Sequence, residues 1–454
     1  MTYEEFLSKK LFLDTPTRFE PKGISKKLFP FQQDITTWAC RRGRAALFED
    51  CGLGKTPQQL EWARQVNQNT DKPVLILAPY CVAQQTRYQG EKFGIEVNLA
   101  HKDDEIVDGI NITNYEKLHK FNASRFSGIV LDESSILKSY DGKTRDAIID
   151  AFARTPFKLA CTATPAPNDF MELGNHAEFL GVMTREEMLA TFFVHDGGET
   201  SKWRLKRHAQ KDFWRWICSW AVNIRKPSDL GYENEGFELP KLNMVEHVVE
   251  SNQKMDGYLF ALPASSLQER RDARRSSLSE RVEAAVKLAD KSKEQWVFWC
   301  NLNSESEAIA DALKATEIRG STTEDEREEI SKEFLSGKLK RVVTKPSIWG
   351  FGMNLQCCAN TALVGLSDSY EEFYQVIRRF WRFGQTKQVN AHIIISHLEG
   401  AVLSNIHRKE SDSKKLADEM IANVSDISSV EIKGTKRNQE TYTANQKIIL
   451  PKFL

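Results

Sequence analysis

The residue types that bind phosphate groups occur together in residues 48–56, which read Phe-Glu-Asp-Cys-Gly-Leu-Gly-Lys-Thr and follow a short apolar run. A strand, a glycine turn and a helix start place backbone N–H groups where they point at phosphate oxygens. Lys55 adds a positive charge, and the hydroxyl of Thr56 is suited to bind Mg²⁺. Glu49 occupies the first glycine position of the GxxxxGK[ST] pattern, so a glycine turn with an incidental Lys-Thr is the alternative. We interpret the stretch as a nucleotide site.

Two adjacent carboxylates, Asp132 and Glu133, come directly after the strand-like run 127–131. The first acid of such a pair can hold Mg²⁺ through water, and the second can orient and deprotonate an attacking water. An acidic helix N-cap after a strand is the alternative for this pair taken alone. Because a phosphate-binding stretch precedes it in the same chain, we interpret the pair as a second part of one site.

Arginines with helical spacing occur in the second half of the chain, in residues 375–385. Arg379 and Arg382 are three apart, and Arg378 and Arg382 are four apart, so these sets share a helix face or its edge. Arginines on a helix in a second lobe are what a clamp on a γ-phosphate requires. Surface arginines on an amphipathic helix are the alternative for this segment alone.

Runs that read as strands occur in both halves of the chain; most are apolar, and the one at residues 244–249 alternates. They span residues 45–48, 73–79, 110–115, 127–131 and 158–167 in the first half, and 244–249, 295–301, 341–344, 361–366 and 391–395 in the second. Strands that alternate with helix-compatible stretches predict an α/β fold with parallel sheets. Ligands of such sheets bind at the carboxyl ends of the strands, which is where the candidate residues occur.

The composition is that of a soluble globular protein, with 41% hydrophobic and 28% charged residues. A chain of 454 residues favours two domains plus an insertion. We expect no membrane span, because no apolar run approaches ~18 residues, and no secretory signal. The eight cysteines form no CxxC pair, so we expect reduced thiols in a cytosol and no structural zinc site. The net charge of zero neither supports nor excludes nucleic acid as a partner.

Aromatic and basic residues alternate between residues 196 and 240. The aromatic residues are Trp203, Phe213, Trp214, Trp216 and Trp220, and the basic ones are Lys202, Arg204, Lys206, Arg207, Lys211 and Arg215. Such a mixture could contact the backbone and bases of nucleic acid. We favour the other interpretation, a small helical insertion whose aromatic residues form its own core.

The order of these signals resembles that of the superfamily 2 helicases, and within them the Swi/Snf-type DNA-translocating ATPases, over residues 26–405. Residues 50–56 are similar to the D-x-G-L-G-K-T motif I of that branch, in which an acidic residue replaces the first glycine. Residues 375–385 match the Q-x3-R-x2-R-x-G-Q string of motif VI, which few unrelated helices carry. The remaining matches are Gln32 with the adenine-reading glutamine motif, residues 77–79 with motif Ia, 112–115 with Ib, 132–133 with II and 162–165 with III, and Gly350, Gly352, Asn354 and Leu355 with motif V. Residues 365–370 also resemble compact phage and prophage members.

The resemblance implies two RecA-like parallel-sheet lobes in tandem, with a helical insertion between them and ATP·Mg²⁺ in the cleft. We expect the domains to be an N-terminal arm at residues 1–25, an ATP-binding lobe at 26–195, a helical insertion and linker at 196–240, a second lobe at 241–405, and a C-terminal brace and mobile tail at 406–454. The expected location is the cytosol of a bacterium or of a phage-infected host.

The resemblance also implies roles for individual residues. The nucleotide would be bound by Gln32, Gly52, Gly54, Lys55, Thr56, Gly350 and Gly352, and Mg²⁺ by Thr56 and Asp132. The catalytic residues would be Lys55, Glu133, Arg379 and Arg382, with Glu133 activating water and the two arginines reaching across from the second lobe. The nucleic-acid contacts would come from Thr113, Asn114, Thr162 and Asn354. We expect the partner to be double-stranded DNA rather than RNA, bound mainly through phosphates and therefore with weak sequence preference.

The function that this pattern predicts is nucleic-acid-stimulated ATP hydrolysis that drives translocation along DNA or its remodelling. One alternative is a strand-separating RNA or DNA helicase of the same superfamily. The other is an ATP-gated nucleic-acid-binding module with weak hydrolysis. Ser134 and Ser135 keep that alternative open, because motif II of the family usually continues D-E-G/A-H. Trp349 is a further departure, since many relatives have glycine before motif V.

Overall fold

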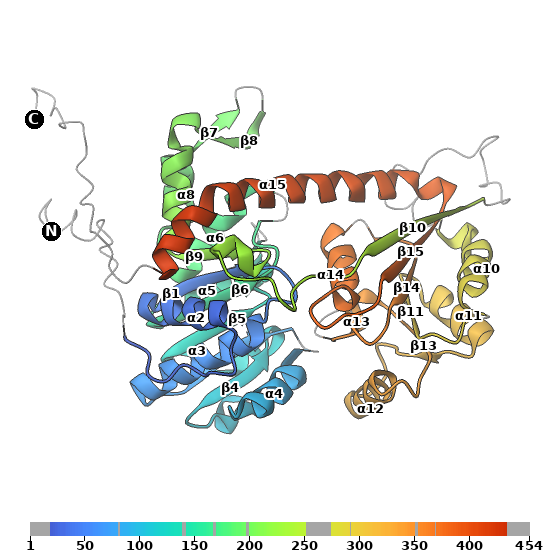
Figure 1. Cartoon of the computed structure of the whole chain (residues 1–454), viewed down its shortest axis with the longest axis horizontal. Helices are drawn as coiled ribbons and strands as arrows, with labels where there is room; N and C mark the ends of the chain where they lie inside the picture. Colours follow the sequence, from blue (N-terminus) through green and yellow to red (C-terminus); the bar gives the residue numbers. More distant parts are fainter. Residues whose placement is uncertain are drawn as a thin grey trace, which may run out of the picture.

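The structure is a computed structural model that describes residues 19–79, 82–138, 142–166, 169–196, 199–250, 274–290, 292–349, 353–367 and 369–433. Two parallel sheets organise these residues, each with helices against it (Figure 1). Most of the expected N-terminal arm, residues 1–18, and the expected mobile tail, residues 434–454, lie outside the described residues.

The first sheet has seven strands within the described ranges, in the order β3-β4-β2-β5-β6-β1-β9, and its neighbouring strands are parallel. The strands are β1 (Arg44–Glu49), β2 (Val74–Ala78), β3 (Val97–Leu99), β4 (Ile110–Asn114), β5 (Gly128–Asp132), β6 (Phe157–Thr162) and β9 (Ala221–Ile224). A parallel sheet covered on both faces requires nearly continuous apolar strands. The interior strand β2 meets this requirement, since all of its residues are buried.

Helices cover both faces of the first sheet. Alternate residues of a strand point to opposite faces, so Leu75 and Leu77 belong to one hydrophobic core whereas Val74 and Ile76 belong to the other. The first core is covered by α5 (Lys143–Ala151), α6 (Leu173–Leu180), α7 (Arg185–Phe192) and α8 (Gln210–Cys218), and the second by α2 (Pro30–Arg42), α3 (Lys55–Thr70) and α4 (Val82–Phe93). The short 3₁₀ turns are η1 (Asp103–Glu105), η2 (Tyr115–Lys120), η3 (Ala123–Arg125), η4 (Ser134–Lys138), η5 (Phe170–Glu172), η6 (Arg207–Ala209), η7 (Pro227–Leu230) and η8 (His397–Glu399).

The segment expected to be a helical insertion contains strands as well as a helix. An antiparallel hairpin of β7 (Phe193–Asp196) and β8 (Glu199–Leu205) precedes α8, and β9 then adds an edge to the first sheet. The buried aromatic residues Phe213, Trp214 and Trp220 pack into the core of the first lobe rather than into a separate one. The sequence did not predict β9, because this strand is short and directly follows the aromatic residues that we assigned to the helical insertion.

The second sheet has six strands within the described ranges, in the order β10-β15-β14-β11-β13-β12, and they are also parallel. The strands are β10 (Leu242–Val249), β11 (Trp296–Cys300), β12 (Thr316–Glu317), β13 (Arg341–Thr344), β14 (Asn360–Val364) and β15 (Val389–Ser396), and the helices are α10 (Leu278–Ala289), α11 (Asn303–Leu313), α12 (Glu324–Leu335), α13 (Pro346–Trp349) and α14 (Tyr370–Phe380). The predicted α/β class with two RecA-like parallel-sheet lobes is confirmed.

One long helix, α15 (Gly400–Lys433), connects the two lobes (Figure 1). It begins directly after the second sheet, where Val402 and Ile406 pack into the second-lobe core. Its later part packs against α8, β9 and η7, and Met420 lies in the first-lobe core. Arg225 and Asp418 form an ion pair of 2.6 Å along this contact. None of the helices in the described part of the chain is both long enough and apolar enough to span a membrane.

Replacement of Met420 by alanine tests whether α15 is docked on the first lobe. Met420 is 3% exposed, and removing a buried methionine side chain costs about 2 kcal/mol or more. We expect a lower urea midpoint in the unfolding of the first lobe, followed by the fluorescence of its buried tryptophans. Lys414→Ala, at an exposed position on the same helix, is the matched control and should change the midpoint little. Equal midpoints for the two variants would contradict the docking.

Candidate active site

The turn between β1 and α3 has the backbone shape of a phosphate-binding loop. Gly52 and Gly54 have φ angles of 93° and 83°, in the left-handed region that glycine adopts without a steric penalty. Gly54 is also the residue that caps the N-terminus of α3, so the first backbone N–H groups of that helix face the turn. A Cβ atom at Gly52 would lie 2.9 Å from the backbone N of Phe383. Glycine at this position therefore serves both the turn and the close approach of the second lobe.

The side chain of Lys55 lies across this loop. Its Nζ donates hydrogen bonds to the carbonyl oxygens of Glu49, at 2.6 Å, and Asp50, at 3.3 Å. The carboxylate of Glu49 is fully buried and accepts a hydrogen bond of 2.8 Å from Nε2 of Gln58. Burial raises the pKa of Glu49 to about 7, although Lys55 and Gln58 oppose the increase. The side chain of Glu49, at the first glycine position of the pattern, is thus held in the protein interior.

Gln32 contacts the same loop from α2. Its Nε2 donates a hydrogen bond of 2.7 Å to the carbonyl oxygen of Leu53, and its Oε1 accepts one of 3.0 Å from the backbone N of Phe29. The side chain is buried. These contacts fix the position of the loop relative to α2. The role of Gln32 in reading adenine stays a prediction.

Asp132 and Glu133 lie at the carboxyl end of β5. Oδ1 of Asp132 accepts a hydrogen bond of 2.8 Å from Nε2 of Gln59, and its carbonyl oxygen accepts one of 2.7 Å from the hydroxyl of Tyr115. Burial and the neighbouring charge of Glu133 raise the pKa of Asp132 to about 6. Glu133 has a φ angle of 56°, which is uncommon for a residue with a side chain. Its Oε2 is buried and has no hydrogen-bond partner within the described part of the chain.

The arginines of the second lobe face these acids. Nη2 of Arg379 lies 4.0 Å from Oε1 of Glu133 and donates a hydrogen bond of 2.8 Å to Oε1 of Gln375. Burial and the charge of Arg379 lower the pKa of Arg382 to about 10. The Cβ atom of Arg382 lies 3.6 Å from the position that a Cβ atom at Gly52 would take. The two lobes therefore bring the phosphate-binding loop, the acid pair and both arginines together.

The residues at this junction fit ATP and Mg²⁺. Thr56 is three residues before Gln59 on α3 and so shares its face, which contacts Asp132. A hydroxyl and a carboxylate are oxygen ligands of the kind that Mg²⁺ takes. Because the two acids repel each other and one carboxylate oxygen of Glu133 lacks a partner among the described residues, the site favours a cation and a polar ligand.

The residues predicted to contact nucleic acid occupy different environments. Thr113, Asn114 and Thr162 lie at the carboxyl ends of β4 and β6 and are buried. Asn354 follows α13 in the second lobe and is partly exposed. The structure therefore places three of the four at one sheet edge but does not present them on the surface. Gly350 and Gly352, predicted to bind the nucleotide, lie outside the described residues.

The sequence predicted neither Tyr374 as a site residue nor a contact between Asp50 and Arg378. Asp50 forms an ion pair with Arg378 and accepts a hydrogen bond of 2.6 Å from the hydroxyl of Tyr374. Tyr374 and Arg378 are four apart on α14 and therefore share a face. That spacing, in a helix that also carries the predicted arginines, is the signal that could have revealed them.

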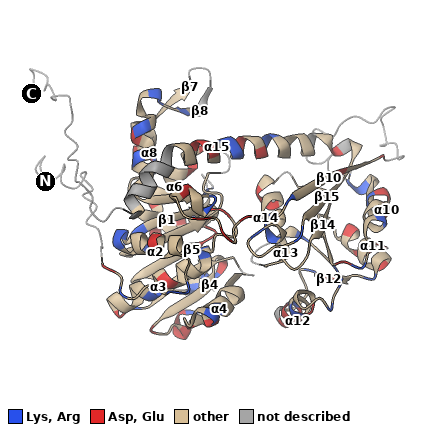
Figure 2. Ribbon diagram, viewed as in Figure 1, with Lys and Arg blue, Asp and Glu red and all other residues tan. Residues whose placement is uncertain are grey.

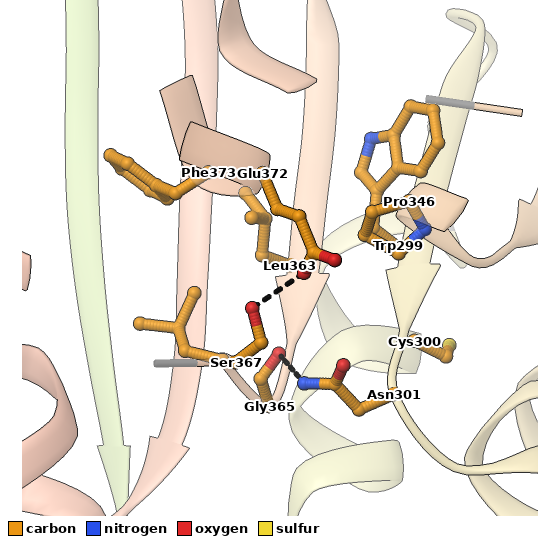
Figure 3. Close-up of a pocket in the computed structure, with 10 residues that line it drawn as sticks. Trp299, Cys300, Asn301, Pro346, Leu363, Gly365, Ser367, Glu372 and Phe373 are labelled. Atoms are coloured by element: carbon orange, nitrogen blue, oxygen red, sulfur yellow. Dashed lines mark hydrogen bonds between the residues drawn. The ribbon is translucent and has the colours of Figure 1, made fainter. Parts of the chain in front are cut away.

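Two cavities lie within the described part of the second lobe. One cavity lies at the carboxyl ends of β11 and β14 and has a volume of about 10 Å³. Ser367, which lines it, donates a hydrogen bond of 2.6 Å to Glu372 (Figure 3). This volume suits about one water molecule, so the cavity is too small for a nucleotide. A larger pocket of about 490 Å³ lies beside β12 and β13, where Arg319 is paired with Glu317.

The sequence comparisons give relatives for the whole two-lobe region. A family model described as "Helicase conserved C-terminal domain" matches residues 280–384. The chain is 22% identical over 414 residues to the Xenopus laevis "SWI/SNF-related matrix-associated actin-dependent regulator of chromatin subfamily A-like protein 1", with 81% of this chain and 42% of the relative covered. It is 26% identical over 166 residues to the Bos taurus "DNA annealing helicase and endonuclease ZRANB3", with 33% and 15% covered. The chain thus spans less than half the length of the curated relatives it matches.

Among solved structures, the chain is similar to the "Sulfolobus solfataricus SWI2/SNF2 ATPase core in complex with dsDNA", with 19% identity, 92% of this chain and 97% of that chain covered, and a TM-score of 0.42. The likeness to compact phage and prophage members stays a prediction. The order of motifs from the phosphate-binding loop to α14, the helicase C-terminal match and the SWI/SNF-related sequences agree with one another. They show that the chain is similar to superfamily 2 helicase-like proteins of the Swi/Snf type.

Proposed function

We propose that the protein hydrolyses ATP and uses the energy to translocate along double-stranded DNA or to remodel it. The observation that carries the proposal is the meeting of three distant segments at one junction. The phosphate-binding loop and Glu133 come from the first lobe, and Arg379 comes from the second, 4.0 Å from Glu133. A change in the distance between the lobes would therefore assemble or disassemble the site, which is how hydrolysis can be coupled to movement.

Each residue at the junction has a distinct role in the proposed reaction. Lys55 leaves the carbonyl oxygens of Glu49 and Asp50, and with the loop N–H groups it binds the phosphates. Thr56 and Asp132 would hold Mg²⁺, which when bound neutralises charge on the phosphate oxygens. Glu133 orients the attacking water and accepts its proton.

The arginines act from the opposite side of the proposed site. Arg379 and Arg382 stabilise the charge that develops on the transferred phosphoryl group. A contribution of this kind supplies ~10³–10⁵ in rate, or about 4–7 kcal/mol. Because both arginines belong to the second lobe, the rate depends on closure of the two lobes.

The DNA partner is proposed from the relatives and from a basic surface of the first lobe. The printed names of two relatives refer to chromatin and to DNA annealing. Exposed basic residues lie on and next to α8 (Figure 2), namely Arg204, Arg207, Lys211 and Arg215. Of the aromatic residues beside them, Phe213, Trp214 and Trp220 are buried and Trp203 and Trp216 are partly buried. We therefore propose contacts mainly to phosphates, with little sequence preference. RNA is the less favoured partner, and a cytosolic location is part of the proposal.

An ATP-gated binding module with weak hydrolysis is the second candidate. Ser134, which departs from the family's motif II, is buried and hydrogen bonded at 3.1 Å to Nε2 of His176. Ser135 stands at the position of the motif II histidine, so this chain would lack the coupling to the second lobe that such a histidine supplies. A steady-state ATPase assay with and without DNA separates the two candidates. Strand displacement, compared with triplex displacement on duplex DNA, separates a strand-separating helicase from a duplex translocase.

Substitution of Lys55 by alanine tests the nucleotide site. The loop loses its positive charge, and we expect DNA-stimulated hydrolysis to fall to about 1% of the wild-type rate or below. Lys72→Ala, at an exposed position in the same lobe, is the control and should retain full activity. Retained turnover in the Lys55 variant would refute the assignment.

Substitution of Arg379 by alanine tests the contribution of the second lobe. We expect kcat to fall by about 10³-fold or more, while ATP binding, measured with a fluorescent analogue, stays nearly unchanged. Arg408→Ala, at an exposed position on α15, is the control. If the Arg379 variant instead loses ATP binding, the arginine binds the ground state and its proposed role is wrong.

Neutralisation of the basic surface tests the contact with DNA. Replacement of all four residues, Arg204, Arg207, Lys211 and Arg215, by glutamine should flatten the dependence of log Kobs on log salt by up to about 3.6, since each phosphate contact contributes about 0.9. A matched set of exposed lysines elsewhere on the first lobe, Lys26, Lys72, Lys92 and Lys102, serves as control. An equal slope in both sets would exclude the surface from DNA binding.

A further inference from the structure

A cluster of polar side chains joins the phosphate-binding loop to α14. The carboxylate of Asp50 forms an ion pair with Arg378 and accepts a hydrogen bond of 2.6 Å from the hydroxyl of Tyr374. Nη2 of Arg378 also donates to the carbonyl oxygen of Cys51, at 3.4 Å. Helix α14 lies on the side of the second lobe that faces the first (Figure 1). The cluster therefore links the two lobes directly at the loop.

These side chains are sheltered from water. Arg378 is 6% exposed and Asp50 is 18% exposed. Burial raises the pKa of Asp50, but the charge of Arg378 and hydrogen bonds from Tyr374, Arg378 and Cys51 outweigh it and hold the pKa below its ordinary value. Burial likewise opposes the charge on Arg378, and Asp50 reverses that effect and raises its pKa. Each charge at this interface is stable because the other is present.

The cluster fixes the position of the neighbouring catalytic groups. Arg379 follows Arg378 directly, and its backbone carbonyl accepts a hydrogen bond of 3.0 Å from Leu355. At the other end of α14, Glu371 forms an ion pair with Lys138, which follows the acid pair in the chain. The backbone of Phe383 lies against Gly52. A displacement of α14 from the loop would consequently move Arg379 away from Glu133.

We propose that Asp50, Tyr374 and Arg378 form an interlobe clamp that holds α14 against the phosphate-binding loop and thereby aims Arg379 and Arg382 at the reacting phosphate. The proposal rests on the proposed function. The three are positioning residues, because they act on the loop and on the arginines rather than on the nucleotide. Hydrolysis requires α14 to stay in this position against the loop, since a shift of about 1 Å in a catalytic group costs up to 10²-fold in rate.

A double-mutant cycle on the full chain tests the clamp. Asp50→Asn and Arg378→Gln should each lower kcat by about ten- to hundredfold, with a smaller change in KM for ATP, and each should lower Tm because one buried charge loses its partner. The neutral double variant should recover Tm. Its kcat should stay as low as in the single variants, because the clamp is already broken in each. Tyr374→Phe, which removes only the hydroxyl, should show an intermediate loss.

Two outcomes of the cycle would overturn the clamp. If kcat recovers together with Tm in the double variant, the pair serves stability alone. If the two single effects multiply in the double variant, the residues act independently and are not coupled as the structure has them. Lys387→Gln is the matched control, because Lys387 pairs with Glu294 within the second lobe at an exposed position. It should change neither kcat nor Tm appreciably.

Amide hydrogen exchange provides a test that does not depend on catalysis. Asp50→Asn, in the first lobe, should increase exchange in α14, residues 370–380. Arg378→Gln, in the second lobe, should increase exchange in residues 50–54. Changes confined to the substituted lobe would overturn the clamp. Absence of ATPase activity in the wild-type protein with duplex DNA would instead overturn the proposed function, and the exchange experiment would still decide the clamp.

Discussion

Burial of both faces of the first sheet is the constraint on which the rest of the structure depends. Helices cover the first sheet on both sides, so its strands are apolar along most of their length. Polar side chains can then be accommodated mainly where the strands end. The phosphate-binding loop follows β1, and the acid pair closes β5. The chemistry is gathered at one edge because the remaining surface of the sheet is occupied by hydrophobic packing.

The second requirement is a defined contact between the lobes, since half of the proposed site comes from each. Electrostatics supply part of that contact. Asp50 and Arg378 are both poorly exposed to water. In such a sheltered place the attraction between unlike charges is stronger than in bulk solvent. The approach of Phe383 to Gly52 adds a steric condition. Gly52 is therefore required for two reasons: the turn of the loop needs its positive φ angle, and the second lobe approaches too closely for a side chain.

Helix α15 constrains the same two bodies from a different direction. Its first turns belong to the core of the second lobe, and Met420 belongs to the core of the first. A continuous helix resists bending, because each residue in it is held by backbone hydrogen bonds. Any change in the separation of the lobes must therefore bend α15 or release part of its docking. The proposed motion is in this way linked to a hydrophobic contact far from the nucleotide site.

Much of the architecture was predictable from local patterns. Continuous apolar runs predicted the parallel strands, and the residues after β1 and β5 predicted the loop and the acid pair, because strand formation and glycine conformation depend on short stretches of chain. The motif order also predicted that Arg379 would face the site, which the distance to Glu133 supports. Two features were not predictable in this way. The strand β9 was assigned to a helical insertion, and Asp50 was treated as part of a motif with no partner.

The sequence by itself determined the fold class, the order of the two lobes and the residue types available for phosphate chemistry. Only the tertiary structure decided which of those residues meet across the lobes. It paired Asp50 with Arg378, placed Tyr374 against the same carboxylate and buried Thr113 and Thr162, which the sequence had marked for nucleic acid. The physical reason is that contacts between residues hundreds of positions apart depend on how two separately folded sheets dock. The residue pattern of the phosphate-binding loop or of α14, taken alone, does not predict how the two lobes dock.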